Sequence, residues 1–121
     1  MVFKIENRIA GPRPLTQSVL QITEMLGLYQ AELARILHLQ CSDIGRLSSG
    51  KSVLEEHSDS RQQATLFLDF YQWLYIHFDG DSVAMCNWLR RENKELGGVP
   101  LLLMVDELRI NDVSNYLKQL V

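Results

Sequence analysis

The chain has few cysteines and no long hydrophobic run, and we do not expect a secretory leader. Its two thiols, Cys41 and Cys86, are too few for the disulfide scaffold of a small secreted domain. No apolar run approaches the roughly 18 residues that a membrane-spanning helix requires. Residues 1–14 mix charged side chains with few apolar ones, unlike a signal peptide. We therefore expect a cytoplasmic protein with reduced thiols and no membrane partner.

A basic excess is also missing. The chain has 12 Lys and Arg against 15 Asp and Glu, a formal net charge of -3, and neither half is basic. A protein that binds nucleic acid through overall charge would carry the opposite balance. Any DNA binding must therefore come from a local patch, a dimer or a basic partner.

Apolar residues recur at helical spacing, and no segment shows the alternation of a half-buried strand. The pattern predicts one all-α domain, a helical bundle with an N-terminal helix-turn-helix and a C-terminal helical subdomain. We divide it into an extended lead-in (1–14, ending in a stiff turn at 11–14), an N-terminal region (15–60, with a polar linker at 55–60) and a C-terminal region (61–121). The expected helices are near 15–26, 30–37, 41–47, 65–78, 82–89, 101–105 and 111–120.

Turn and cap residues mark several helix ends. Gly27 is expected to end the first helix, residues 79–82 to form a turn with an N-cap, Pro100 to begin a short helix and Asn111 to cap the last one. The aromatic segment 65–78 is apolar on more than one side. It is therefore either the central helix of the core or the site of a dimer contact.

Residues 27–51 read GLYQAELARIL and then HLQCSDIGRLSSGK, two short helices joined by a turn. This pattern resembles the Xre (phage-repressor-like) helix-turn-helix. Small Ala34 lets the two helices approach closely, and apolar residues at 33, 37 and 44 are expected to lock them together. Glu32 and Arg35 are expected to face solvent, and the second helix is left free for the major groove.

The resemblance implies a DNA-binding face. Arg46 would reach a guanine edge or a phosphate, while Asp43 would repel phosphate and suit cytosine. His38 stands where the family usually has glycine, in a left-handed turn that histidine tolerates, and Gly45 weakens the second helix. A helix-turn-helix that no longer binds DNA is the alternative. The residues assigned to DNA are Gln30, Gln40, Cys41, Ser42, Asp43, Arg46 and Lys51.

Residues 88–101 read WLRRENKELGGVPL and are similar to the toxin-binding domain of Xre/MbcA/ParS-type antitoxins. That pattern has a Trp-Leu pair, an Asn, Leu-Gly-Gly, Pro-Leu and a terminal helix. The family often has one more residue before the proline and a Thr- or Arg-rich segment after it. This chain instead has an apolar run, Leu101–Met104, after the proline. The same residues also fit a plain structural turn, with Trp88 anchored in the core and a tight turn at 96–98.

The second resemblance implies an antitoxin of a type II toxin-antitoxin system. Such a protein blocks the NAD pocket of its partner toxin, a RES-type NAD-degrading or ADP-ribosyltransferase-like enzyme, and represses the shared promoter through its helix-turn-helix. The implied partners are the cognate toxin, operator DNA and a second copy of the chain, since a helix-turn-helix of this size most often binds a palindrome as a dimer. The residues assigned to toxin binding are Arg90, Arg91, Asn93, Lys94, Gly97 and Gly98.

Two other functions remain open: a stand-alone Xre-family transcriptional regulator whose C-terminal region dimerises, and an interaction module with a vestigial helix-turn-helix. We expect no catalytic activity and no cofactor, because no oriented Cys-His pair and no phosphate-binding glycine loop are found. His38 and Cys41 lack a second close pair of zinc ligands. Residues 79–81 lack the remaining positions of a calcium loop.

Overall fold

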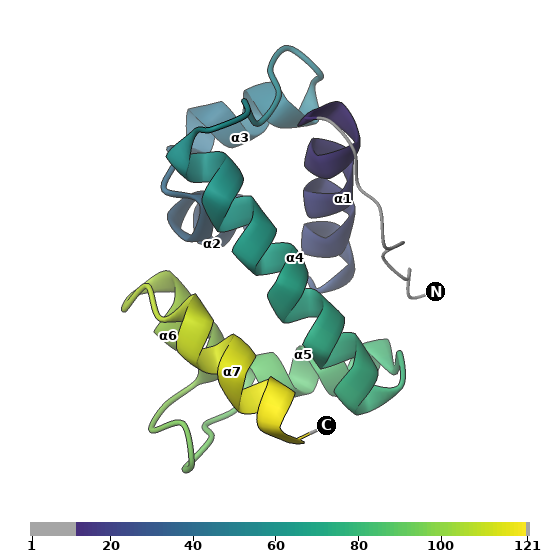
Figure 1. Cartoon of the computed structure of the whole chain (residues 1–121), viewed down its shortest axis with the longest axis vertical. Helices are drawn as coiled ribbons and strands as arrows, with labels where there is room; N and C mark the ends of the chain where they lie inside the picture. The colour runs from purple at the N-terminus through teal and green to yellow at the C-terminus, as the bar shows by residue number, and fades with distance from the viewer. Residues whose placement is uncertain (1–11, 121) are drawn as a thin grey trace.

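The computed structural model describes residues 12–120 and confirms the all-α prediction (Figure 1). Within that range no strand forms, and a single antiparallel bridge joins Asn93 to Gly98. None of the helices built by these residues is both long and apolar enough to cross a membrane. The helices are α1 (Pro12–Met25), α2 (Gln30–Leu37), α3 (Cys41–Ser48), α4 (Asp59–Phe78), α5 (Ser82–Arg90), α6 (Pro100–Val105) and α7 (Ile110–Leu120).

The 20-residue helix α4 runs through the middle of the molecule. Figure 1 shows α1, α2 and α3 around its N-terminal part, and α5, α6 and α7 around its C-terminal part. Helix α4 packs against α1 and α2, which precede it in the sequence, and against α5 and α7, which follow it. Helix α2 also contacts α6. The N-terminal and C-terminal helices therefore share α4 as a common support.

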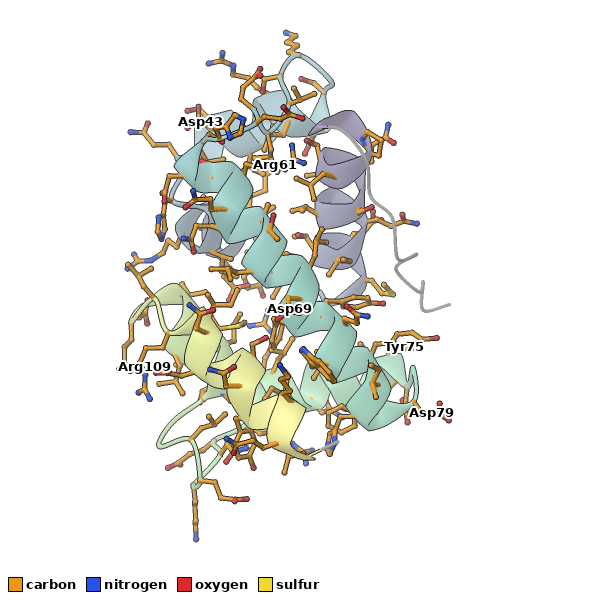
Figure 2. The ribbon with its side chains drawn as sticks, in the orientation of Figure 1. Asp43, Arg61, Asp69, Tyr75, Asp79 and Arg109 are labelled. Atoms are coloured by element: carbon orange, nitrogen blue, oxygen red, sulfur yellow. The ribbon has the colours of Figure 1, made fainter. Side chains whose placement is uncertain are left out.

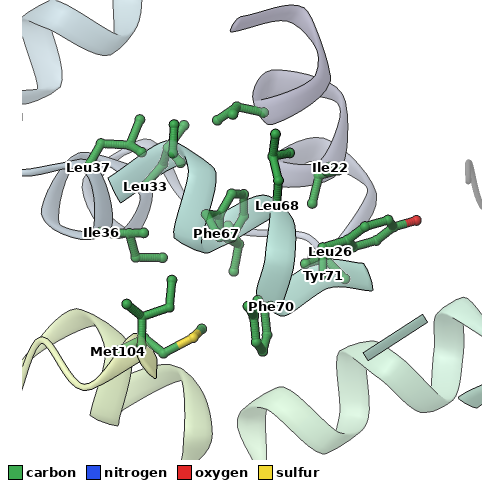
Figure 3. Packing of buried hydrophobic residues seen from close by; sticks show 14 of the residues in the cluster. Ile22, Leu26, Leu33, Ile36, Leu37, Phe67, Leu68, Phe70, Tyr71 and Met104 are labelled. Atoms are coloured by element: carbon green, nitrogen blue, oxygen red, sulfur yellow. The ribbon is translucent and has the colours of Figure 1, made fainter. Parts of the chain in front are cut away.

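The core is one continuous cluster that draws side chains from both ends of the molecule. Phe67, Phe70 and Tyr71 of α4 are completely buried, and Figure 3 shows them among α1, α2 and Met104 of α6. Burial raises the pKa of the Tyr71 hydroxyl, which therefore stays neutral. Of the two readings of the aromatic segment, the central helix is confirmed for these residues. Ile76 of the same helix is 45% exposed, and a dimer contact on that surface stays a prediction.

Several helix ends lie where their residues predict. Gly27 has φ +69° at the end of α1, and the Leu28 amide donates to the Thr23 carbonyl across 3.0 Å, which closes a Schellman turn. The Asp81 carboxylate caps α5 by accepting from the Ala84 amide at 3.1 Å. Pro100 occupies the first turn of α6, where its missing N–H costs nothing.

The start of α1 was predicted wrongly. The helix begins at Pro12 rather than at residue 15, so the stiff turn expected at 11–14 is helical over 12–14. Proline is compatible with the first turn because the amides there have no intrahelical acceptor. The rest of the lead-in, residues 1–11, lies outside the described residues.

Two further boundaries differ from the prediction. Helix α4 begins at Asp59, six residues before the expected start, because the Ser58 hydroxyl caps it by accepting from the Arg61 amide at 3.1 Å. The polar linker 55–60 therefore ends at Ser58. Asn111 does not cap α7, since that helix already begins at Ile110 and its first carbonyl acceptor belongs to Arg109.

Candidate functional site

Helices α2 and α3 pack on each other as their apolar pattern predicts. Leu33, Ala34, Leu37 and Ile44 are all buried. In the turn between the helices, His38 adopts a left-handed backbone conformation, with φ 61° and ψ 40°, as expected at a position that favours glycine. Its Nδ1 lies 2.6 Å from a carboxylate oxygen of Asp59, which ties the turn to the start of α4.

The residues assigned to DNA lie at the surface, with one exception. Arg46 and the polar residues at 41 and 42 are exposed on α3, whose other face buries Ile44 and Leu47. Gln30 is exposed in the first turn of α2, Gln40 precedes α3, and Lys51 follows it. The structure therefore places all the predicted DNA contacts on or beside the two packed helices.

Asp43 is the exception, because it is half-buried at the start of α3 (Figure 2). Its carboxylate accepts a hydrogen bond from the Gln40 backbone amide at 3.0 Å. An acidic group is favourable at a helix N-terminus, where backbone N–H groups are unpaired. Asp43 thus has a local structural role in addition to its assignment to a cytosine. The three-residue spacing between Gln40 and Asp43 is the sequence signal for this capping role.

Residues 91–99 form a loop between α5 and α6 that projects from the lower half of the molecule in Figure 1. Asn93 organises this loop. Its side-chain oxygen accepts from the amides of Glu95 (3.0 Å) and Leu96 (3.1 Å). Its backbone amide donates to the Gly98 carbonyl at 2.8 Å. The tight turn expected here is present, and Asn93 shapes it from within.

The two glycines of the loop serve its shape as well. Gly97 has φ +83°, a conformation that L side chains rarely adopt. A Cβ on Gly98 would lie 3.3 Å from a methyl group of Leu103. Both glycine amides donate to the Asn93 carbonyl, at 2.9 and 3.2 Å. These backbone donors, assigned to a toxin from the sequence, are therefore already used inside the loop.

Arg90, at the root of the loop, is also engaged within the chain. Its guanidinium donates to the Gly27 carbonyl at 2.9 Å and to both carboxylate oxygens of Glu32 at 3.1 and 3.3 Å. The hydrogen bond to Glu32 raises the pKa of Arg90 above its ordinary value, so the guanidinium stays charged. The prediction that Glu32 faces solvent is wrong, because the Arg90 contact leaves its side chain only 17% exposed.

Arg91 and Lys94 are the cations that the loop presents outward. Both are exposed, and neither makes an ion pair within the part of the chain that the structure describes. They differ in this from Arg90, which binds Glu32. Of the six residues assigned to toxin binding, these two side chains can reach another molecule without breaking a contact inside the chain.

Helix α7 supports the loop through contacts that sequence reasoning missed. The Tyr116 hydroxyl donates to a carboxylate oxygen of Glu95 at 2.9 Å, and the Tyr116 ring stacks on Trp88 with centroids 6.4 Å apart. Trp88 is half-buried at the base of the loop rather than deep in the core. The terminal helix thus braces the loop from one side.

Neither thiol has a metal-binding environment. Cys41 is exposed and Cys86 is half-buried, and both are free. Across residues 12–120, no three or more His, Cys, Asp or Glu side chains gather in a way that could hold a metal ion.

Comparison with known proteins finds a family match in the C-terminal part of the chain. Residues 74–120 match the family described as the antitoxin Xre/MbcA/ParS C-terminal toxin-binding domain. This segment is similar to that toxin-binding domain. The match confirms the resemblance carried by residues 88–101 and extends it to the end of α4, to α5 and to α6 and α7. None of the curated proteins matches the chain.

The toxin-binding domain therefore contains both the projecting loop and the helix that braces it. A domain of this kind implies a protein toxin as partner and an antitoxin role for the chain. It also points to a regulatory rather than a catalytic protein.

Proposed function

We propose that the chain is the antitoxin of a type II toxin-antitoxin system, which binds a partner toxin and represses its own promoter. The match of residues 74–120 to the toxin-binding domain is the observation that carries the proposal. The partner is a RES-type NAD-degrading enzyme or an ADP-ribosyltransferase-like enzyme, as the family resemblance implies. The antitoxin acts by covering the NAD pocket and contributes no chemistry of its own.

Loop 91–99 is the part of the domain suited to enter or cover a pocket. It projects beyond the helices, and internal hydrogen bonds around Asn93 fix its shape before binding. A preformed loop loses little conformational entropy when it is captured. In this proposal Asn93, Gly97 and Gly98 present the loop, while Arg91 and Lys94 pair with acidic groups at the pocket rim.

Promoter binding is assigned to α3 and its flanks. Helix α3 carries Arg46 on an exposed face, and Gln30 and Lys51 flank it at the surface. Since the chain has a net charge of -3, the attraction to phosphate must be local to this face or be doubled in a homodimer. Asp43 caps the same helix through one carboxylate oxygen, and its contact with a cytosine stays part of the proposal.

Affinity purification of a tagged copy from the native host tests the proposal. The expected result is a second polypeptide in stoichiometric amount that consumes NAD once it is separated from the chain. A matched variant with Arg91→Glu and Lys94→Glu should fold and lose the polypeptide. A homodimer that carries DNA and no second polypeptide would instead favour a stand-alone regulator.

A further inference from the structure

Arg90 joins two parts of the chain that lie about 60 residues apart in sequence. It is the last residue of α5, directly before loop 91–99. Its guanidinium binds Glu32, 58 positions earlier, through both carboxylate oxygens, and it binds the Gly27 carbonyl, 63 positions earlier. The same group lies over the Tyr29 ring, 5.5 Å from its centroid. The root of the loop is thus fixed to the start of α2.

Glu32 has a second role at the same place. Its Oε1 atom accepts from the Tyr29 backbone amide at 2.8 Å and from Arg90 at 3.1 Å. The first of these bonds satisfies an unpaired amide at the start of α2. Gln30, which is assigned to a DNA phosphate, is the first residue of that helix. A movement of Arg90 therefore acts on the carboxylate that fixes the segment carrying Gln30.

A second arginine links the same two regions without touching the loop. Arg35, in the last turn of α2, donates to the Val105 carbonyl at 3.2 Å and lies 3.7 Å from Asp106. These partners are at the C-terminal end of α6, whereas the loop enters α6 at its N-terminal end. Arg35 therefore holds the two regions together but is not placed at the root of the loop.

We propose that Arg90 is a positioning residue that links occupancy of loop 91–99 to the first turn of α2 through its ion pair with Glu32. The effect of this link on toxin and DNA binding rests on the proposed function. A toxin that draws residue 91 and Arg90 toward itself loosens the cap of α2 and lowers affinity for operator DNA. By linkage, DNA that fixes Gln30 lowers affinity for the toxin by the same factor.

Hydrogen exchange of backbone amides in the isolated chain, followed by NMR, tests the link without toxin or operator. The loop is perturbed by Asn93→Ala, which removes the bonds to Glu95 and Leu96. With Arg90 present, exchange at the Tyr29 amide should rise about fivefold, the factor set by weakening one hydrogen bond. In the Arg90→Ala background the same loop change should add nothing at Tyr29.

Two variants keep the test specific. Tyr116→Phe is a milder loop perturbation, which removes one bond to Glu95 and keeps the aromatic ring, so it serves if Asn93→Ala unfolds the chain. Arg35→Ala is the matched control, because it removes the other arginine that links α2 to the C-terminal helices. In the Arg35→Ala background, the loop change should still raise hydrogen exchange at the Tyr29 amide.

Equal rises at Tyr29 with and without Arg90, or no rise in either, would overturn the proposal. Either result is independent of the antitoxin role, which the affinity purification tests separately. If a toxin is recovered and exchange is unlinked, the Arg90 link is wrong and the antitoxin role stands. If exchange is linked and no polypeptide is recovered, the link stands and the proposed function fails.

Discussion

The Tyr116 hydroxyl donates a hydrogen bond to the Glu95 carboxylate across 2.9 Å, which ties α7 to loop 91–99. The ring of Tyr116 also stacks on Trp88 at the base of the loop, so the terminal helix contacts the loop region in two ways. The helix holds the loop in the shape that Asn93 gives it. Under the proposed function, the loop meets the toxin already in this conformation.

Removing this bond alone should affect binding more than stability. Tyr116→Phe keeps the ring stack and deletes one exposed hydrogen bond, so the free energy of unfolding should fall by about 1 kcal/mol or less. Affinity for the partner toxin should fall several-fold, because the loop must then be ordered during binding. Denaturant unfolding and calorimetric titration check the two quantities. Unchanged affinity would show that α7 does not present the loop.

Charge reversal at the loop should abolish toxin binding and leave the fold intact. Arg91→Glu with Lys94→Glu changes two exposed side chains that make no ion pair in the described part of the chain, so the melting temperature should barely change. The measurement is co-purification of the toxin. Lys51→Glu, which changes an exposed residue that follows α3, is the control that should retain the toxin and weaken DNA binding. Retention of the toxin by the loop variant would move the contact elsewhere.

Arg46→Ala should weaken binding to the DNA upstream of the chain's own gene by about 1–3 kcal/mol. Its side chain is exposed on α3, so the loss should come from the DNA contact and not from unfolding. Fluorescence anisotropy at two salt concentrations measures the effect, and toxin binding should be unchanged. If the promoter affinity stays the same, Arg46 is not on the reading surface.

The two loop glycines should respond differently to alanine. Gly97→Ala should lower the free energy of unfolding by about 1 kcal/mol, since a Cβ is strained at φ +83°. Gly98→Ala should cost less, because the Leu103 methyl group 3.3 Å away belongs to a side chain that can shift. Denaturant melts of both variants decide this. A larger loss at Gly98 would mean that Leu103 is fixed.

Leu108→Gly should raise stability by up to about 1 kcal/mol. Leu108 has φ +56° and is 57% exposed, so a branched side chain occupies a left-handed position where it gains little from burial. The Arg109 amide donates to the Leu103 carbonyl at 2.9 Å, and glycine at position 108 would keep this bond. Denaturant unfolding measures the change. A loss of stability would assign Leu108 a packing contribution.

The local features of this fold could be predicted from the sequence. Some features depend on neighbouring residues alone. They are the turn at Gly27, the cap by Asp81, Pro100 at the start of α6 and the left-handed conformation of His38. The start of α1 could not be predicted, because proline is equally compatible with a turn and with the first turn of a helix. The same holds for Asn111, whose capping preference was overridden by a helix that begins one residue earlier.

The sequence predicted which segments form the candidate site, but not which residues contact one another within it. The loop and the exposed face of α3 follow from their motifs. The engagement of Arg90 does not, since its partner Glu32 lies 58 residues away and no short pattern links them. The capping role of Asp43 was missed for a different reason, because only its possible base contact was considered and not its three-residue spacing from Gln40.

The most direct test of the antitoxin role is the NAD content of cells that express the recovered partner polypeptide. Expression of the partner alone should deplete NAD and stop growth, and co-expression of the chain should restore both. The Arg91→Glu, Lys94→Glu variant should fail to restore them, although it is present at the same level. If NAD is depleted equally with and without the chain, the chain does not neutralise this partner and its role as the antitoxin is contradicted.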